Sequence, residues 1–379
     1  MLTTQSGPAW NPATNKLQVL RQVDLAGNIV RETNAGIVQQ QLLTMGATDG
    51  GPCDTIPRPA PVGSACLDTF HHDAIQTLPT GETAVLVNIE KIFPPGTHGD
   101  KSGLPVDVIG DMIVVLDATW QVIYYWDAFQ HDSSSQLDIN RAPVLGEVCV
   151  AGNATCPPLL LLGTGIAPHA SDWLHLNALY YWPQNGDILV SARNQDWIFK
   201  VDYRNGRPTG TGNVVWRMGA CGNFTFNNIY NDPWPWYSHQ HQIGIQNNGA
   251  GPLTALDNGN TRVSPPTGPG SSSGCMPGVG SGSSRGMAVT INETTLQVSP
   301  VLSADLNGFS SSGGSAQSLG NGNYFFADPN VIIGTAPTSF SIEIFPTPGT
   351  DTGTPVSNIE GPQAYRAFCM PSLYNPPIS

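Results

Sequence analysis

Five of the eight histidines of this chain lie in three short clusters, and each cluster precedes a turn followed by an apolar run. The clusters are FHHDAIQTLPTG with His71 and His72, DWLHLNALYYWPQNG with His175, and WYSHQHQIGIQNNG with His239 and His241. Imidazoles that meet in space could bind a transition metal or serve as general acid and base. They could also provide a nucleophile that forms a covalent intermediate. For each histidine the alternative is a hydrogen-bonded structural role.

Arg193 decides among these chemistries. It ends the second strand of a predicted hairpin whose first strand carries His175 and Asn177. A guanidinium is unfavourable beside a metal cation but suits a sulfate or phosphate group, whose oxygens it can bind in pairs. The sequence therefore predicts an oxyanion-transfer site and no metal. Histidine would be nucleophile or acid there, and arginine with histidine would stabilise the developing charge.

An aromatic patch, DPWPWYSHQH, precedes the third histidine cluster. Trp236 and Tyr237 in this patch either fill the core or form a substrate wall that stacks on an aryl ring. The Gly-rich segments lack the Gly-Lys-Ser/Thr ending of a phosphate-binding loop, so we expect no nucleotide.

The sequence predicts that many short β-strands position these residues. Only 11% of the 379 residues are charged, and 42 Gly and 33 Pro punctuate short apolar runs, which indicates an all-β protein. A turn-plus-strand unit alternates along the chain with a strand–turn–strand unit. This alternation predicts a β-propeller of about six blades, each with four antiparallel strands, around a central funnel lined by the innermost strands. A β-sandwich is the alternative fold.

We expect one propeller domain over residues 1–379, with an N-terminal extension at 1–19 and a Gly/Ser/Pro-rich loop at 263–286. The net charge of −13 with scattered basic residues argues against nucleic acid as a partner. No apolar run is long enough to span a membrane. The seven cysteines favour an oxidising compartment, so the sequence predicts a secreted or periplasmic protein with disulfides Cys53–Cys66 and Cys149–Cys156.

At the histidine clusters the sequence resembles the bacterial arylsulfate sulfotransferases, which use no nucleotide sulfate donor. The similarity covers about residues 20 to 330, and residue types, order and approximate spacing agree. The matching motif residues are His71, His72 and Asp73, then Asp172, Trp173, His175, Asn177 and Arg193, then Gln240 and His241, and finally Asp257, Asn258 and Gly259.

The resemblance implies a six-bladed propeller without cofactor and a ping-pong reaction between a phenolic sulfate ester and a phenol. His241 would be the sulfated nucleophile, and His239 is the alternative. His175 and Arg193 would hold the sulfuryl oxygens with help from Asn177.

In the same family pattern, His71 and His72 would donate a proton or contact the oxyanion. A monomer is expected as readily as a homodimer, because the family's N-terminal β-domain has no counterpart here. Two other functions fit the same residues: a hydrolase or lyase on this scaffold, and a non-catalytic propeller that binds an anionic ligand or glycan.

Overall fold

The computed structural model of the chain describes residues 2–5, 16–75, 78–150, 169–204, 209–245, 249–263, 282–306 and 308–370. β-Strands dominate these residues, and their longest helix is α2 (Ala35–Thr44). The Asn34 side chain caps this helix by accepting a hydrogen bond from the Ile37 amide at 2.9 Å. None of the described helices has the length and apolar character needed to cross a membrane.

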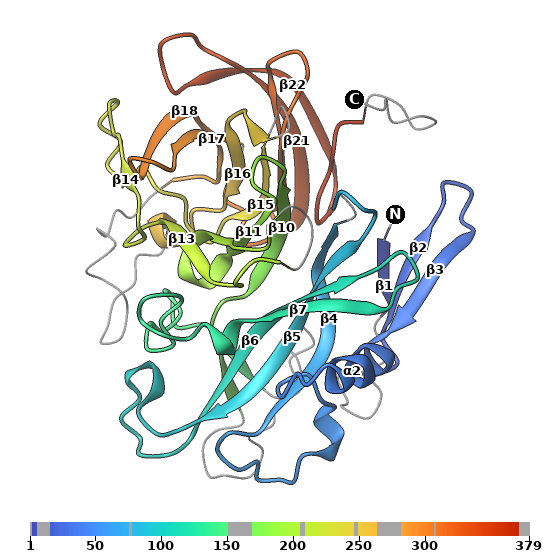
Figure 1. Cartoon of the computed structure of the whole chain (residues 1–379). Coiled ribbons are helices and arrows are strands. Elements are labelled where there is room, and N and C mark those ends of the chain that lie inside the picture. The colour runs from blue at the N-terminus through green and yellow to red at the C-terminus, as the bar shows by residue number, and fades with distance from the viewer. Residues whose placement is uncertain are drawn as a thin grey trace.

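Five sheets form in the described residues (Figure 1). The N-terminal sheet contains β1 (Leu2–Gln5), β2 (Val19–Val23) and β3 (Ile29–Asn34). The second contains β4 (Ala65–Ile75), β5 (Thr83–Phe93), β6 (Val106–Leu116), β7 (Val122–Asp127), β8 (Val148–Val150) and β9 (His169–Asp172). The third contains β10 (Leu176–Trp182), β11 (Asp187–Ala192), β12 (Trp197–Val201) and β13 (Val214–Gly219).

The fourth sheet contains β14 (Thr225–Phe226), β15 (His241–Ile245), β16 (Leu253–Asp257), β17 (Arg285–Asn292) and β18 (Gln297–Asp305), and the one-turn helix α3 (Asn260–Val263) follows β16. The fifth contains β19 (Ser315–Ser318), β20 (Tyr324–Ile333), β21 (Ala336–Pro346) and β22 (Gly353–Pro362).

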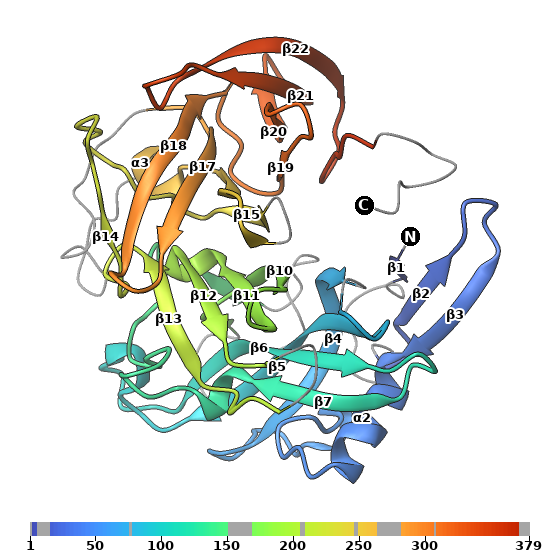
Figure 2. The same ribbon diagram turned by 45° about the horizontal axis from the view of Figure 1, so that its top comes forward.

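The last four sheets share one topology. Each includes four consecutive antiparallel strands, β4–β7, β10–β13, β15–β18 and β19–β22. Their first strands β4, β10, β15 and β19 lie beside one another in that order, near the middle of the molecule (Figure 2). This is the blade arrangement of a propeller, in which first strands face a common axis. The predictions of an all-β chain and of repeated four-stranded units are therefore confirmed.

The number of blade-like sheets differs from the expected six. The described residues form four meanders of four strands and one sheet of three strands. The N-terminal sheet stays at three strands because the hairpin of β2 and β3 runs directly into helix α2 at Ala35 and not into a fourth strand.

The hairpin that carries the central motif forms as the sequence predicts. Strands β10 and β11 pair antiparallel from Leu176 to Trp182, and every residue of β11 is buried. The turn between them places Gly186 at a φ of 78°, a conformation that glycine adopts without steric cost. Burial on both faces explains the continuous apolar run in β11, because neighbouring sheets cover it on each side.

Disulfides support the predicted use of cysteine. Cys53 and Cys66 are bonded to each other, which confirms that pair. Cys149 is disulfide-bonded as well, but the predicted partner Cys156 lies outside the described residues. Cys221 is also disulfide-bonded, and Cys369 is a free, exposed thiol.

After β22 the chain turns back toward the middle of the molecule and runs along β19. Ser315 Oγ accepts a hydrogen bond from the Ala367 amide at 3.2 Å, and Cys369 N donates to Gln317 Oε1 at 3.0 Å. We call residues 363–370 the C-terminal segment.

Candidate active site

Each of the first three inner strands is irregular where the sequence carries its histidines. The pairing register shifts after His71 in β4, after Leu176 in β10 and after His241 in β15. His72 and His175 have positive φ angles of 47° and 51°. β-Bulges and left-handed residues redirect side chains and are enriched next to active sites. The three irregularities therefore mark one end of the inner strands as the candidate site.

In the first cluster, His71 connects the His72 imidazole to the carboxylate of Asp111. His71 Nε2 lies 3.0 Å from Asp111 Oδ1, and the two Nδ1 atoms of His71 and His72 are 2.8 Å apart. A carboxylate beside Nε2 of His71 favours a proton there, so His71 Nδ1 accepts and His72 Nδ1 donates. Nε2 of His72 then keeps its lone pair.

His72 is exposed to solvent, and its ring lies beside those of His71 and His175. Desolvation by the surrounding protein, and after it the charge of His175, lowers the pKa of His72 to well below 6.5. Its imidazole is therefore neutral at physiological pH and available as a base.

In the second cluster, the His175 imidazole pairs with the carboxylate of Asp172, three residues earlier in the chain. His175 Nδ1 lies 2.6 Å from Asp172 Oδ2, and the carboxylate requires a proton on that nitrogen. Burial acts to raise the pKa of Asp172, but His175 outweighs it and the pKa is lowered. The pairing fixes the ring and leaves Nε2 for a contact outside the pair.

The third cluster contains the best-defined tautomer of the site. His241 Nδ1 lies 2.7 Å from Asn258 Oδ1 and 3.2 Å from the His239 carbonyl oxygen. The Asn258 amide nitrogen donates to the Ser310 and Gly313 carbonyls, so its oxygen must face the ring. Both neighbours of Nδ1 are thus acceptors, and the proton of His241 sits on Nδ1.

Nε2 of His241 carries the lone pair and accepts a hydrogen bond from the Gly313 amide at 3.2 Å. Only 1% of the residue is exposed, and burial together with the charge of Arg193 holds its pKa well below 6.5. His241 is a neutral imidazole with an unprotonated Nε2, the state in which the ring is nucleophilic.

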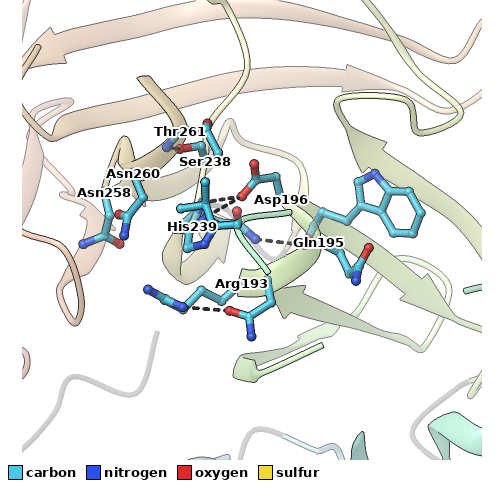
Figure 3. Close-up of polar contacts among 12 residues, drawn as sticks. Arg193, Gln195, Asp196, Ser238, His239, Asn258, Asn260 and Thr261 are labelled. Carbon is cyan, nitrogen blue, oxygen red and sulfur yellow. Dashed lines mark hydrogen bonds and ion pairs between the residues drawn. The ribbon is translucent and has the colours of Figure 1, made fainter. Parts of the chain in front are cut away.

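His239 lies in a different environment (Figure 3). It is fully buried, its Nδ1 is 2.8 Å from Asp196 Oδ1, and its Nε2 contacts Glu147 Oε1 closely. Burial and Arg193 act to lower the pKa of His239, but the two carboxylates outweigh them and raise it. Both ring nitrogens are occupied by acceptors, so His239 has no lone pair to offer a substrate.

Arg193 extends from the helical turn that follows β11 toward the same region (Figure 3). Nη1 donates to Asn194 Oδ1 at 2.7 Å, Nη2 donates to the Ser311 carbonyl at 3.3 Å, and Nη1 lies 3.9 Å from Glu147. Because Glu147 also contacts Nε2 of His239, Arg193 lies beside the third cluster.

The clusters meet although they come from three sheets. The rings of His72 and His175 contact each other edge to face with centroids 4.7 Å apart. The Tyr365 ring lies 6.2 Å from the ring of His72 and 6.2 Å from that of His241. The structure therefore brings together His71, His72, His175, His241 and Arg193, as the sequence predicts.

Three other predicted residues have contacts inside the protein. Asn177 is fully buried and its side chain donates to the Gln240 carbonyl at 2.7 Å, so it joins β10 to the start of β15. The Tyr237 hydroxyl donates to Met218 O at 2.6 Å within the core. Trp236 packs edge to face on Phe226. Substrate contact by these three remains a prediction.

Several partners of the site were not singled out from the sequence. Asp172 and Asn258 belong to the matching sequence motifs, but the motifs assign neither of them a role. Glu147, Asp196 and Tyr365 lie far along the chain from the histidines that they contact. No local sequence pattern therefore links these residues to the site. Among the described residues, no group of three or more His, Cys, Asp or Glu side chains could hold a metal ion.

Comparison with known families agrees with this geometry. The family model described as arylsulfotransferase (ASST) matches residues 1–346. The chain belongs to the arylsulfotransferase family. The match agrees with the family that the sequence motifs resemble, and it leaves residues 347–379 outside the matched region.

Other comparisons add little. No curated protein matches the chain. Among solved structures, dihydro-heme d1 dehydrogenase NirN in complex with DHE is similar, with 11% identity and a TM-score of 0.32 over 93% of this chain. The chain spans 61% of the length of that protein, and a likeness at this score supports no conclusion about function.

Proposed function

We propose that this protein is an aryl sulfotransferase that moves a sulfuryl group from a phenolic sulfate ester to a phenol through a sulfated histidine. The observation that carries the proposal is the state of His241, a neutral imidazole with Nδ1–H bonded to Asn258 and a lone pair on Nε2. Arg193 and His175 provide the donors that an anionic group would need beside that nucleophile.

In the first step, Nε2 of His241 attacks the sulfur of the aryl sulfate. The S–N bond forms as the S–O bond to the aryl group breaks, and the phenolate leaves with the electron pair. Negative charge spreads over the sulfuryl oxygens as this bond breaks, and Arg193 with His175 stabilises it. The Gly313 amide, which now donates to Nε2, is placed to donate to a sulfuryl oxygen instead.

In the second step, a phenol takes the sulfuryl group from His241. The phenol must lose its proton as its oxygen bonds to sulfur, and His72 is the neutral base placed to accept it. Nε2 of His72 holds the free lone pair, while its Nδ1 leads through His71 to the Asp111 carboxylate. That carboxylate stabilises the imidazolium that forms.

His239 takes a supporting role in this proposal. Its two nitrogens bind Asp196 and Glu147, so it positions the start of β15 and does not become sulfated. The Glu147 carboxylate, 3.9 Å from Nη1 of Arg193, also balances part of the charge of that arginine.

No nucleotide sulfate donor or other cofactor enters the proposed reaction, since the aryl sulfate itself supplies the sulfuryl group. We also propose an oxidising, secreted or periplasmic setting, which the disulfide Cys53–Cys66 supports. The proposed assembly state is a monomer or a homodimer.

The test is release of nitrophenol from p-nitrophenyl sulfate with and without a second phenol. Release that rises with acceptor concentration, together with formation of the sulfated acceptor, supports the transferase. Steady acceptor-independent turnover would assign the site to a hydrolase instead, and no release under either condition contradicts an aryl sulfate donor. The His241→Asn variant should lose both steps, and a variant with full activity would remove His241 from the mechanism.

A further inference from the structure

The C-terminal segment lies beyond the region that the family model matches, yet it enters the site. The family match ends at residue 346, and the segment covers 363–370. Besides its bonds to β19, the segment fixes its backbone through the Tyr365 carbonyl, which accepts from the Gly314 amide at 2.8 Å. Gly314 directly follows the residue whose amide donates to His241 Nε2. The segment is therefore tied to the same loop that contacts the nucleophile.

Arg366 connects the segment to the first two inner strands. Its Nη1 lies 3.2 Å from Asp73 Oδ1 on β4, and its Nη2 donates to the Asn177 carbonyl on β10 at 2.5 Å. Only 12% of each of the Arg366 and Asp73 side chains is exposed. An ion pair this enclosed, with a backbone bond in addition, is a specific attachment and not a surface contact. The segment thus bridges β19 to β4 and β10.

This attachment places the Tyr365 side chain among the catalytic groups. Its ring meets that of His241 edge to face at 85° and lies tilted at 57° to that of His72. The Arg366 guanidinium carbon also lies 5.1 Å from the centre of the Tyr365 ring, so the aromatic side chain is held beside this cation. Tyr365 still keeps 44% of its surface exposed, so small molecules can reach it.

A tyrosine side chain is a para-alkylated phenol, the same chemical class as the acceptor in the proposed function. Here it stands between the proposed nucleophile and the proposed base. We propose that Tyr365 occupies the acceptor position and is itself a sulfate acceptor, so that the enzyme carries an internal modification site. This inference rests on the proposed function and adds a peptide-borne phenol to its acceptors.

The transfer would proceed without any further reactant. After an aryl sulfate has sulfated His241 and its phenolate has left, the S–N bond breaks and an S–O bond forms to Tyr365 Oη. The phenol proton passes to His72 Nε2, and His241 returns to its neutral state. The product is a tyrosine O-sulfate at residue 365 and one free phenol for each donor consumed.

The test is a mass measurement on the full chain incubated with p-nitrophenyl sulfate and no added phenol. Cleavage after Glu360 and Arg366 releases the peptide GPQAYR, which separates Tyr365 from the other tyrosines. We expect this peptide to gain about 80 Da in most molecules, the mass of one transferred sulfuryl group. Nitrophenol release should then equal about two molecules per chain, one from the sulfuryl group passed on to Tyr365 and one from the second sulfation of His241.

Two variants make the result specific. Tyr365→Phe keeps the ring but removes the hydroxyl, and it should abolish the stable label. Tyr230→Phe, in a loop away from the histidines, should leave the label on GPQAYR unchanged. If acceptor-dependent turnover is observed but GPQAYR stays unlabelled, the inference is overturned while the proposed function stands. If neither turnover nor label appears, both fail.

Discussion

Removing the Asn258 side chain tests how the nucleophile is prepared. Its oxygen is the 2.7 Å partner of His241 Nδ1, and no other side chain among the described residues bonds to that atom. We predict that Asn258→Ala slows the first step while the protein still binds the aryl sulfate. The reason is that the Nδ1 proton loses its main acceptor, so the ring can turn or place the proton on Nε2, where attack is blocked.

The expected size follows from the bonds that are lost. Leaving a buried donor without its partner costs about 1–3 kcal/mol, which corresponds to a rate lowered roughly 5- to 150-fold. The His239 carbonyl at 3.2 Å remains as a weaker acceptor, so we expect the lower half of that range. The two bonds from the Asn258 amide to Ser310 and Gly313 are lost as well, which should lower the free energy of unfolding by about 1–3 kcal/mol.

The assay is the pre-steady-state burst of nitrophenol, measured well below the melting temperature of each variant. Asn260→Ala is the matched control, since Asn260 is also buried and donates to the Ser311 carbonyl at 3.1 Å without touching His241. Asn258→Asp keeps the acceptor and should restore most of the burst rate. A burst rate in Asn258→Ala within twofold of wild type would refute the assignment of the Nδ1–H tautomer.

Three further predictions concern charge. Arg193→Gln should lower kcat/KM for p-nitrophenyl sulfate by about 100-fold, since one charged donor to the developing oxyanion is lost. An unchanged value would show that Arg193 does not stabilise the sulfuryl oxygens. Because the pKa of His241 lies well below 6.5, the burst rate should stay level from pH 7 to about 6, and a decline centred at 6.5 would contradict a buried neutral nucleophile. Burial raises the pKa of Asp328 from 3.8 to about 7, so this carboxyl lowers the free energy of unfolding progressively as the pH rises from about 4 to about 7. Asp328→Asn should therefore raise the melting temperature at pH 8 more than at pH 5, and thermal denaturation at both values checks it.

The strands and their grouping could be predicted because they depend on local pattern. The Asn185-Gly186 turn between two apolar runs specifies a hairpin by itself, and repetition of such units specifies stacked sheets. The number of sheets was less predictable. A strand pair reads the same in sequence whether it belongs to a full blade or, like the hairpin before Ala35, leads into a helix.

The histidines could be found because they recur at matching places in the repeat, and Arg193 because it ends the strand that pairs with the one after His175. Their partners could not, because contacts such as Glu147 with His239 and Tyr365 with His241 join residues far apart in the chain. Choosing between His239 and His241 required the structure for the same reason. Both are buried and occupy one short motif, and only the contacts from other segments distinguish them: two carboxylates hold the nitrogens of His239, whereas Nε2 of His241 accepts from the Gly313 amide.

The partial burial of the loop histidines could not be predicted from the sequence either. His131 lies in the polar segment AFQHDSSSQ, a pattern typical of a solvated side chain, yet its ring stacks on Trp126 with centroids 5.1 Å apart. His98 is likewise partly buried, and burial lowers its pKa to about 4. Polar neighbours in sequence do not report which surface a loop folds against.

The central claim is that the sulfuryl group passes through His241. The most direct measurement is rapid quenching of the Tyr365→Phe variant with p-nitrophenyl sulfate, followed by fragment-ion sequencing of the tryptic peptide Met218–Arg262. We predict an added mass of about 80 Da on His241 that disappears when a phenol is added before quenching. A label on His239, or acceptor-dependent turnover with no label on this peptide, would contradict the proposal.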